Sequence, residues 1–285
     1  MSERDRYPAG VPCWVETLQP DVQAALDFYG PVFGWEFAGP GATTGDPPGQ
    51  YFVGRLRGRD VAGVGSLPNT AHTAHTAHTA HTSHTAHRPS WLTYVRVGDA
   101  DETIDRAKRA GGTVLDGPID APPAGRLAVL ADPSGAVVCT WEAGAREGAQ
   151  LVNEPSAWAM STLHTPGTNE ALHFYGAVFG WEPEPFGPVT LWRLPGYVGG
   201  EPKQPVPRDV VGVMAPITPS ANGAAPSPRW SVDFWIDDAD AAAARAEMHG
   251  GTVIVSPHDT PGFRSSVIKD PQGAVFSISQ LVISH

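Results

Sequence analysis

The hydrophobic positions follow two spacings that alternate along the sequence, one of two residues and one of three or four residues. Apolar and polar residues alternate in stretches such as WLTYVRV at 91–97, which predicts a β-strand with one buried face. Apolar residues recur every three or four positions at 22–33, which predicts an amphipathic helix that Pro31 interrupts after Gly30. A strand, a helix and then further strands follow one another four times. The pattern therefore predicts an α+β fold built from four βαβββ units.

A nine-residue segment occurs twice and divides the chain into two modules. It reads FYGPVFGWE at 28–36 and FYGAVFGWE at 174–182, so eight of the nine positions agree. Two copies at so long a distance indicate a duplicated module rather than a solenoid. Two domains of ordinary size are therefore predicted, at 1–146 and 155–285. Two shorter motifs recur with the segment, namely GGTV at 111–114 and 250–253 and the turns DPSG at 132–135 and DPQG at 270–273.

Charge and cysteine content indicate which partners and which cellular compartment to expect. The formal net charge is −11 and no basic cluster is visible, which argues against a nucleic-acid partner. No apolar run approaches the roughly 20 residues of a membrane span, and the polar N-terminus shows no signal peptide. The two cysteines are too few for a disulfide scaffold and fit a reducing compartment. We expect a cytoplasmic protein without a membrane partner, either a monomer of two modules or a homodimer.

The repeated motifs resemble those of the vicinal oxygen chelate superfamily, which comprises glyoxalases, bleomycin resistance proteins and extradiol dioxygenases. The resemblance rests on the FYGxVFGWE segment after a strand and helix, the GGTV helix exit and the DPxGAV hairpin, and both modules carry all three. The chain is similar above all to the tandem glyoxalase-like proteins of actinobacteria. The resemblance implies that the two βαβββ units of each module form a half-barrel around a cleft. It leaves the function open, because this fold serves lyases, isomerases, dioxygenases and drug-binding proteins.

The resemblance also implies where a metal ion would be held. Metal-dependent members take one ligand from the first strand of a unit and a glutamate from its last strand. Counting from the repeated motifs places these positions at Trp14 and Cys139 in the first module and at Met160 and Ser277 in the second. A divalent metal needs three or four converging N, O or S donors. No metal or other cofactor is therefore expected, although a shifted set of ligands remains open.

Other residues on the same predicted strand faces form a candidate small-molecule site. Glu16 lies two positions after Trp14 and points the same way, and its counterpart in the second module is Thr162. An apolar, aromatic cleft with a few placed polar groups is typical of such sites. Glu16 and Asp233 are the candidate catalytic residues. The candidate ligand-binding residues are Trp14, Trp91, Tyr94, Arg96, Cys139 and Trp141 in the first module, and Met160, Thr162, His164, Trp230 and Trp235 in the second.

The ionisable candidates also have structural interpretations. In an apolar pocket the pKa of Glu16 or Asp233 would rise, and the carboxyl could act as a general acid or base. Either carboxylate could instead only hydrogen-bond a neighbouring strand or the other module. Cys139 is more commonly a buried, inert thiol than a nucleophile. His164 is more commonly a loop histidine than an acid–base group.

A Thr-Ala-His repeat occupies 70–87 and carries six of the eleven histidines. Such an array can bind Ni, Cu or Zn. The equivalent loop of the second module, at 219–228, has no histidine. This comparison favours an insertion that a surface loop tolerates at little cost in stability. Metal binding and pH sensing are the alternatives.

The expected function is metal-independent binding of a small organic molecule, an antibiotic or secondary metabolite, as the bleomycin resistance proteins in the resemblance imply. The alternative is a glyoxalase-like lyase or isomerase, or a cyclase-type tailoring enzyme, in which Glu16 or Asp233 moves a proton beside a carbonyl. A metal-dependent dioxygenase ranks third, because non-haem iron needs two histidines and a carboxylate. The sequence names neither the ligand nor the cleft that binds it.

Overall fold

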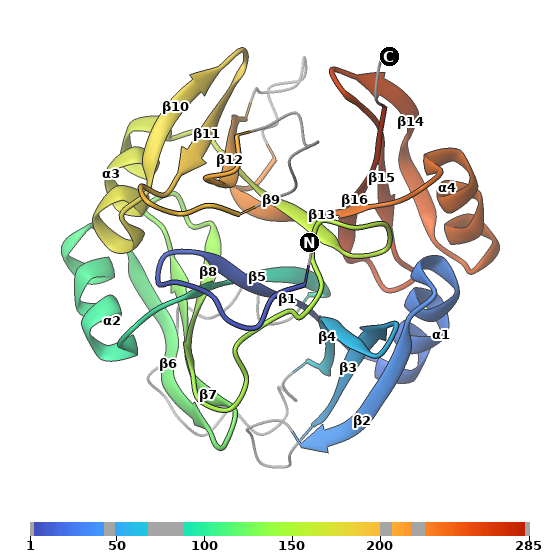
Figure 1. The fold of residues 1–285 in the computed structure, drawn as a ribbon, viewed down its shortest axis with the longest axis horizontal. Helices are drawn as coiled ribbons and strands as arrows, with labels where there is room; N and C mark the ends of the chain where they lie inside the picture. The colour runs from blue at the N-terminus through green and yellow to red at the C-terminus, as the bar shows by residue number, and fades with distance from the viewer. Residues whose placement is uncertain (1–2, 43–48, 68–87, 200–206, 218–225, 283–285) are drawn as a thin grey trace.

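The structure is a computed structural model that describes residues 3–42, 49–67, 88–199, 207–217 and 226–282. These residues form two eight-stranded mixed sheets of matching topology, one from each module (Figure 1). The predicted α+β fold of two tandem modules is therefore confirmed. The Thr-Ala-His repeat at 70–87 lies outside the described residues, so its interpretation stays a prediction.

The elements follow the order that the hydrophobic spacing predicts. The first module contains β1 (Pro12–Gln19), α1 (Val22–Phe33), β2 (Glu36–Ala42), β3 (Gln50–Leu56), β4 (Arg59–Ser66), β5 (Ser90–Arg96), α2 (Ala100–Arg109), β6 (Thr113–Ala121), β7 (Gly125–Ala131) and β8 (Val137–Ala143). The second contains β9 (Trp158–Thr165), α3 (Thr168–Phe179), β10 (Glu182–Phe186), β11 (Val189–Arg193), β12 (Val210–Pro216), β13 (Arg229–Trp235), α4 (Ala239–Met248), β14 (Thr252–Thr260), β15 (Phe263–Lys269) and β16 (Val275–Leu281).

Both sheets join two βαβββ units side by side through their first strands. The strand orders are β2-β3-β4-β1-β5-β8-β7-β6 and β10-β11-β12-β9-β13-β16-β15-β14. β1 runs parallel to β4 and antiparallel to β5, and β9 pairs with β12 and β13 in the same way. Each sheet bends into a half-barrel with its helices on the outside (Figure 1). We call the face turned away from the helices the inner face of each sheet.

Helix α1 has the predicted ends but runs through its proline. Asp21 caps the N-terminus by accepting a backbone N–H at 3.0 Å, and Gly34 ends the helix with a φ of 71°. Pro31 lies inside the helix, which corrects the prediction that the helix stops after Gly30. Pro31 has no N–H to donate to the Asp27 carbonyl, so one helical hydrogen bond is lost. The helix tolerates this loss because Pro31 lies in the last turn and both residues are exposed, so water can bond the Asp27 carbonyl.

The two modules meet through a reciprocal pair of hydrogen bonds between repeated motifs. Tyr29, from the first FYG segment, donates to the Asp270 carboxylate of the second module at 2.7 Å. Tyr175, from the second FYG segment, donates to the Asp132 carboxylate of the first module at 3.1 Å. All four side chains are buried. Each FYG segment therefore binds the DPxG turn of the other module.

The GGTV motif also contacts the FYG segment of the other module. A Cβ on Gly251 would lie 2.9 Å from the ring of Phe28, and one on Gly112 would lie 2.4 Å from the ring of Phe174. Helix α1 packs on α4, and α2 packs on α3, along the two sides of this contact (Figure 1). Glycine is required at both places because a side chain would displace a buried ring. The three motifs that recur in the sequence thus build one interface, twice over.

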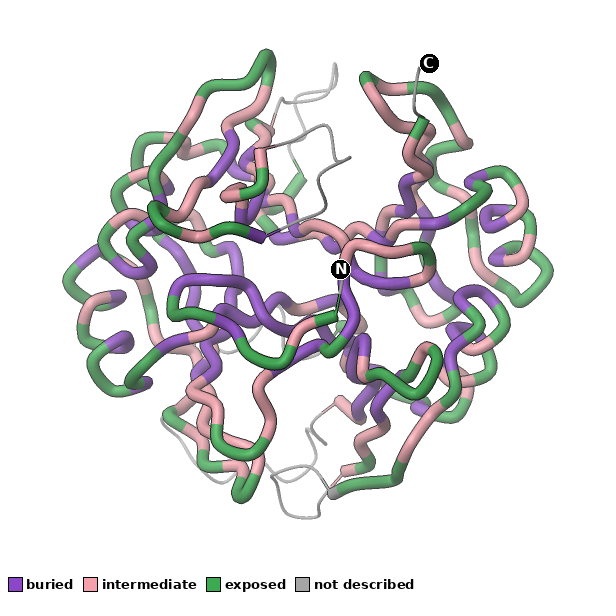
Figure 2. The backbone as a smooth tube through the Cα atoms, viewed as in Figure 1, coloured by how far each residue is buried: buried purple, intermediate pink, exposed green. Residues whose placement is uncertain are grey.

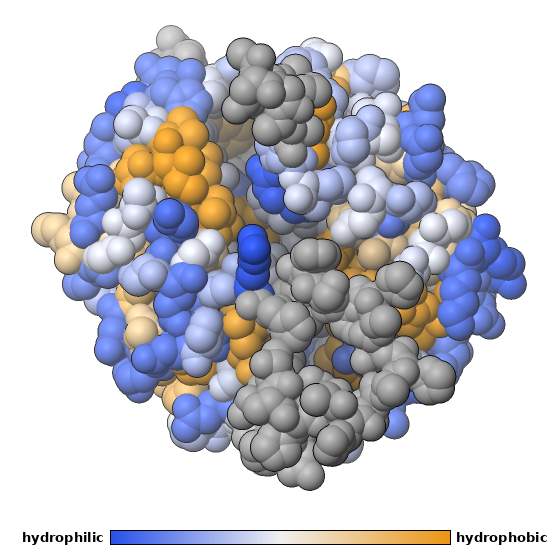
Figure 3. Space-filling view, turned by 180° about the vertical axis from the view of Figure 1, so that it is seen from behind, coloured by the Kyte–Doolittle hydropathy of each residue, from blue (hydrophilic) through white to orange (hydrophobic). Residues whose placement is uncertain are grey.

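An aromatic core fills the space between the modules. Trp91 and Trp230 each donate to the tyrosine of their own FYG segment, at 3.1 and 2.8 Å. Phe33 of the first module contacts Phe234 and Phe276 of the second, with ring centroids 4.8 and 5.7 Å apart. Figure 2 shows the buried residues gathered along the central strands and on the helix faces turned toward them. Seen from behind, polar surface separates the exposed hydrophobic groups (Figure 3).

Candidate functional site

The inner face of the first sheet brings together several of the predicted site residues. The register pairs Trp14 with Tyr94 and Tyr94 with Cys139, so these three side chains form one row across β1, β5 and β8. Glu16 lies one step further along β1, opposite Leu92. Trp14 and Glu16 therefore share a face, as the alternation predicted.

Glu16 is the centre of a closed hydrogen-bond network. Tyr94 donates to its Oε1 at 2.5 Å, and Tyr51 donates to its Oε2 at 2.8 Å. The Trp14 indole donates in turn to the Tyr51 hydroxyl at 3.0 Å. Glu16 is only 8% exposed, and burial raises the pKa of its carboxyl while the bonds from Tyr94 and Tyr51 lower it. The carboxyl is thus satisfied by side chains of the neighbouring strands, as the structural interpretation of Glu16 anticipates.

Tyr51 is the member of this network that sequence reasoning missed. Its ring lies across β4, where two glycines leave space. A Cβ on Gly63 would meet the Tyr51 hydroxyl at 2.1 Å, and one on Gly65 would meet the ring at 3.0 Å. Glycines inside a strand indicate the close approach of another group. The alternate glycines of VAGVGS at 61–66 are therefore the signal that points to Tyr51.

The other side chains on this face, Trp14, Trp141 and Cys139, are also packed against or bonded to neighbouring protein groups. The Arg146 guanidinium lies 5.3 Å from the centroid of the Trp14 ring, and Trp141 donates to the Arg146 carbonyl at 2.8 Å. Cys139 is fully buried, and burial raises the pKa of its thiol. A thiol that stays protonated is a poor nucleophile. The inner face of the first sheet is therefore occupied by side chains that bond to one another.

The same positions of the second sheet carry more open side chains. Met160, Asp233 and Ser277 form the equivalent row across β9, β13 and β16. Thr162 lies one step further along β9, opposite Ser231, and takes the place of the glutamate. All five residues are half-buried. This face therefore presents polar and apolar groups that remain partly accessible.

Two titratable groups lie on this second inner face. Asp233 accepts a hydrogen bond from Ser279 at 2.8 Å, and burial raises its pKa to about 7 although this bond lowers it. His164 lies 2.9 Å from the Ser231 hydroxyl, and burial, followed by the charge of Arg229, lowers its pKa to about 4. At neutral pH, His164 is uncharged and Asp233 is divided between acid and carboxylate. His164 lies on β9, which corrects its interpretation as a loop residue.

Two predicted ligand-binding residues lie elsewhere. Trp91 and Trp230 are buried in the aromatic core between the modules, on the face opposite to Tyr94 and Asp233. The prediction that they line the clefts is therefore wrong, because a separation of three positions along a strand reverses the face. The remaining predicted residues lie on the inner faces by their register, namely Arg96 beside Trp141 and Trp235 beside Ser279.

The side chains on the inner faces do not fit the metal centre that the resemblance implies. The row of the first sheet offers a buried thiol, and the neighbouring Glu16 already accepts two hydroxyls. The row of the second sheet offers the single carboxylate of Asp233. Within the described ranges, no three His, Cys, Asp or Glu side chains gather closely enough to hold a metal ion. A divalent ion needs at least three converging donors, so we assign no step to one.

Comparison with known proteins matches the two modules separately. The Glyoxalase/Bleomycin resistance protein/Dioxygenase superfamily matches residues 14–140, and a family described as Glyoxalase-like domain matches residues 160–279. The putative glyoxylase CFP32 of Mycobacterium tuberculosis is 34% identical over 279 residues, which cover 98% of this chain and 97% of the relative. The anthracycline biosynthesis protein DnrV of Streptomyces peucetius is 32% identical over 280 residues, which cover 97% of this chain and 95% of the relative.

Solved structures share the fold at much lower identity. The Mn(II)-bound glyoxalase from Novosphingobium aromaticivorans superimposes with a TM-score of 0.61 at 16% identity, covering 95% of this chain and 82% of that one. The 2,3-dioxygenase LapB from a Pseudomonas species gives a TM-score of 0.60 at 13% identity, covering 95% and 93%. These likenesses concern the fold alone. None of the helices in the described part of this chain is long and apolar enough to cross a membrane.

Proposed function

Because this chain belongs to the glyoxalase/bleomycin resistance protein/dioxygenase superfamily, we propose that it binds a small organic molecule on the inner face of its second sheet without a metal ion. The contrast between the two inner faces carries this proposal. On the first, Glu16 is buried and bonded to two tyrosines. On the second, the equivalent polar side chains are half-buried, and Asp233 accepts only the Ser279 bond among the described residues. Partly accessible polar groups are what a ligand needs for its hydrogen bonds.

Asp233 is the group that would orient the ligand. Its Oδ1 accepts the bond from Ser279, which leaves the other carboxyl oxygen for a ligand. Since its pKa is about 7, the acid form is well populated at neutral pH and donates to a carbonyl oxygen. The Thr162 hydroxyl lies on the same face. Met160 and Trp235 supply apolar surface around these polar groups.

A hydroxylated aromatic ketone fits this combination of groups. Its carbonyl accepts from the acid form of Asp233, its hydroxyls bond to neutral donors and acceptors such as Thr162 and Ser231, and its rings pack on Trp235. A relative that covers nearly the whole chain is named an anthracycline biosynthesis protein. We therefore place the ligand among the polycyclic aromatic ketones of secondary metabolism.

The pH dependence of binding tests the role of Asp233. With 1,8-dihydroxyanthraquinone as the probe, the affinity of the unaltered protein is expected to fall roughly tenfold between pH 6 and pH 8, because the donating acid form is lost across a pKa of about 7. Asp233→Asn keeps a donor that does not titrate, so its affinity is expected to stay level. Quenching of tryptophan fluorescence measures both. Equal pH profiles for the two proteins would contradict the proposal. Any effect of the probe's own titration is the same for both proteins and therefore cancels in this comparison.

An acid–base enzyme is the second candidate, and the same carboxyl favours it. A group with a pKa near 7 both takes and returns a proton efficiently at neutral pH. An isomerase or lyase would use Asp233 to remove a proton beside the ligand carbonyl and His164, neutral at this pH, to hold the oxygen. Exchange of carbon-bound hydrogen with solvent deuterium, lost in Asp233→Asn, would distinguish this enzyme from a binding protein.

A further inference from the structure

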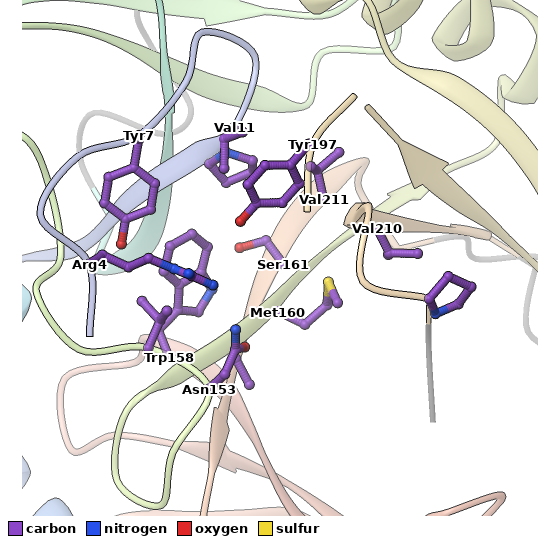
Figure 4. Close-up of a pocket in the computed structure, with 14 residues that line it drawn as sticks. Arg4, Tyr7, Val11, Asn153, Trp158, Met160, Ser161, Tyr197, Val210 and Val211 are labelled. Atoms are coloured by element: carbon purple, nitrogen blue, oxygen red, sulfur yellow. The ribbon is translucent and has the colours of Figure 1, made fainter. Parts of the chain in front are cut away.

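A cavity lies where the N-terminal segment crosses the first residues of β9 and β12. Met160, the strand neighbour of Asp233, is among its lining residues, and Asp233 is not. Its volume is about 50 Å³, and its walls come from several parts of the chain (Figure 4). Arg4 and Tyr7 belong to the N-terminal segment, Trp158 and Ser161 to β9, and Tyr197 to the connection between β11 and β12. The N-terminal segment is held here by backbone bonding of Arg4 to Gln150 at 2.9 Å. The cavity therefore has walls from both modules.

Buried hydrogen-bond donors around this cavity have no acceptor. Nε and Nη2 of Arg4 and Nε1 of Trp158 are buried without a hydrogen-bond partner among the residues that the structure describes. Figure 4 shows the Arg4 side chain extending into the group of lining residues toward Trp158. Leaving a buried donor unpaired costs free energy, and the cost is larger for a charged group. Three such donors at one cavity indicate an acceptor that is supplied from outside the protein.

The geometry of the guanidinium favours an acceptor that presents two oxygens side by side. Nε and Nη2 share one edge of the planar group, and their N–H bonds point the same way. This edge matches the two oxygens of a carboxylate, which it binds through two parallel hydrogen bonds. No acidic side chain lines the cavity, so no lining residue neutralises the charge of Arg4.

The remaining walls favour an apolar body next to the charged group. Val11, Val152 and Val211 line the cavity, and Tyr7 already uses its hydroxyl on the Ala149 carbonyl at 2.6 Å. A larger cavity of about 540 Å³ adjoins it and shares Arg4, Tyr7 and Tyr197. A small cavity that holds the acid group can thus continue into a larger one that holds the rest of a molecule.

We propose that this junction is a binding site for the carboxylate of a small apolar organic acid. The Nε–Nη2 edge of Arg4 holds both carboxylate oxygens, the Trp158 indole donates a third hydrogen bond, and the apolar part of the acid extends between Tyr7 and Tyr197 into the larger cavity. This site does not involve Asp233 and goes beyond the function proposed above.

Titration calorimetry with benzoate, and with benzamide as its uncharged analogue, tests the site. Benzoate is expected to bind saturably and benzamide at least roughly tenfold more weakly, because charge-assisted bonds are lost. Arg4→Met is expected to weaken benzoate binding roughly tenfold to a hundredfold. Trp158→Phe keeps the ring and loses only the indole donor, so a smaller loss of several-fold is expected.

Arg109→Met is the control, because Arg109 is an exposed arginine of α2 that lines neither cavity. Its affinity for benzoate is expected to stay within about twofold of the unaltered protein, since an exposed charge is screened by solvent. The proposal is overturned if benzoate shows no saturable binding, if benzamide binds as well as benzoate, or if Arg4→Met and Arg109→Met behave alike. Should Arg4→Met prove unstable, an unchanged benzoate affinity in Trp158→Phe would overturn it as well.

Discussion

Replacing Asp270 with alanine is expected to lower the free energy of unfolding by about 3–5 kcal/mol, because several buried donors lose their acceptor at once. The carboxylate accepts the Tyr29 hydroxyl and the Gln19 amide at 2.7 Å each, both across the module interface. It also accepts the backbone N–H groups of Gly273 and Ala274 at 2.7 and 2.8 Å, which shape its own turn. The substitution therefore weakens the turn and the contact between modules together.

Chemical denaturation followed by tryptophan fluorescence measures this loss. Asp240→Ala is the control: Asp240 pairs with Arg264 at 2.6 Å on the exposed surface, and its loss is expected to cost less than about 1 kcal/mol. Tyr29→Phe, which removes one of the two side-chain donors that reach Asp270 across the interface, is expected to fall between the two, at about 1–2 kcal/mol. If Asp270→Ala cost no more than Asp240→Ala, the reciprocal interface would not stabilise the protein.

Replacing Gly63 with alanine is expected to cost about 2–4 kcal/mol of folding stability, from overpacking and from the loss of buried hydrogen bonds. The added Cβ would lie 2.1 Å from the Tyr51 hydroxyl and 2.9 Å from the Glu16 Cβ. Tyr51 must then move, and the carboxyl of Glu16 and the indole of Trp14 lose their bonds to it.

A double-mutant cycle with Tyr51→Val separates the clash from other effects. Tyr51→Val removes the hydroxyl that the new methyl group meets, so Gly63→Ala is expected to cost about 1–2 kcal/mol less in that background. Gly58→Ala is the control for losing a glycine without a clash, because a Cβ on Gly58 meets no atom within 4 Å. The φ of 75° at Gly58 adds some backbone strain to this control. Equal costs of Gly63→Ala with and without Tyr51 would show that the tyrosine does not occupy that space.

The two modules differ both in the glycines of the fourth strand and in the residues that these glycines pair with on the first strand. In the first, Gly63 pairs with Glu16 and Gly65 pairs with Leu18. In the second, Val213 and Ala215 stand at the glycine positions, opposite Thr162 and His164. The space for a tyrosine and the carboxylate that it bonds are thus present together in one module and absent together from the other. This joint difference supports a closed inner face in the first module and a ligand face in the second.

The sequence predicts the fold well because each repeated motif coincides with a local signal. Helix stripes, helix-ending glycines and Asp-Pro turns are read from neighbouring residues, and the α+β modules follow from them. The partner of each motif cannot be read in this way. Tyr29 and Asp270 are 241 positions apart, and hydrophobic spacing records only which face of an element is buried. The interface between the FYG segment of one module and the turn of the other therefore appears only in three dimensions.

The site was predictable along a single strand and less so between strands. Alternation places Trp14 with Glu16, and it would also have excluded Trp91 as a neighbour of Tyr94, because an odd separation reverses the face. The contact of Tyr51 with Glu16 depends on the register of three strands, which the sequence does not specify. The cavity at Arg4 depends on how the N-terminal segment crosses the second module, and no periodicity encodes that crossing.

Blocking each inner face in turn tests the proposed ligand site most directly. Ser231 and Leu92 are matched positions, opposite Thr162 and Glu16 respectively, and both are half-buried. With 1,8-dihydroxyanthraquinone, Ser231→Trp is expected to abolish measurable binding by filling the second inner face, and Leu92→Trp to leave the affinity within about twofold. Unchanged binding in Ser231→Trp together with lost binding in Leu92→Trp would place the ligand in the first module and contradict the proposal.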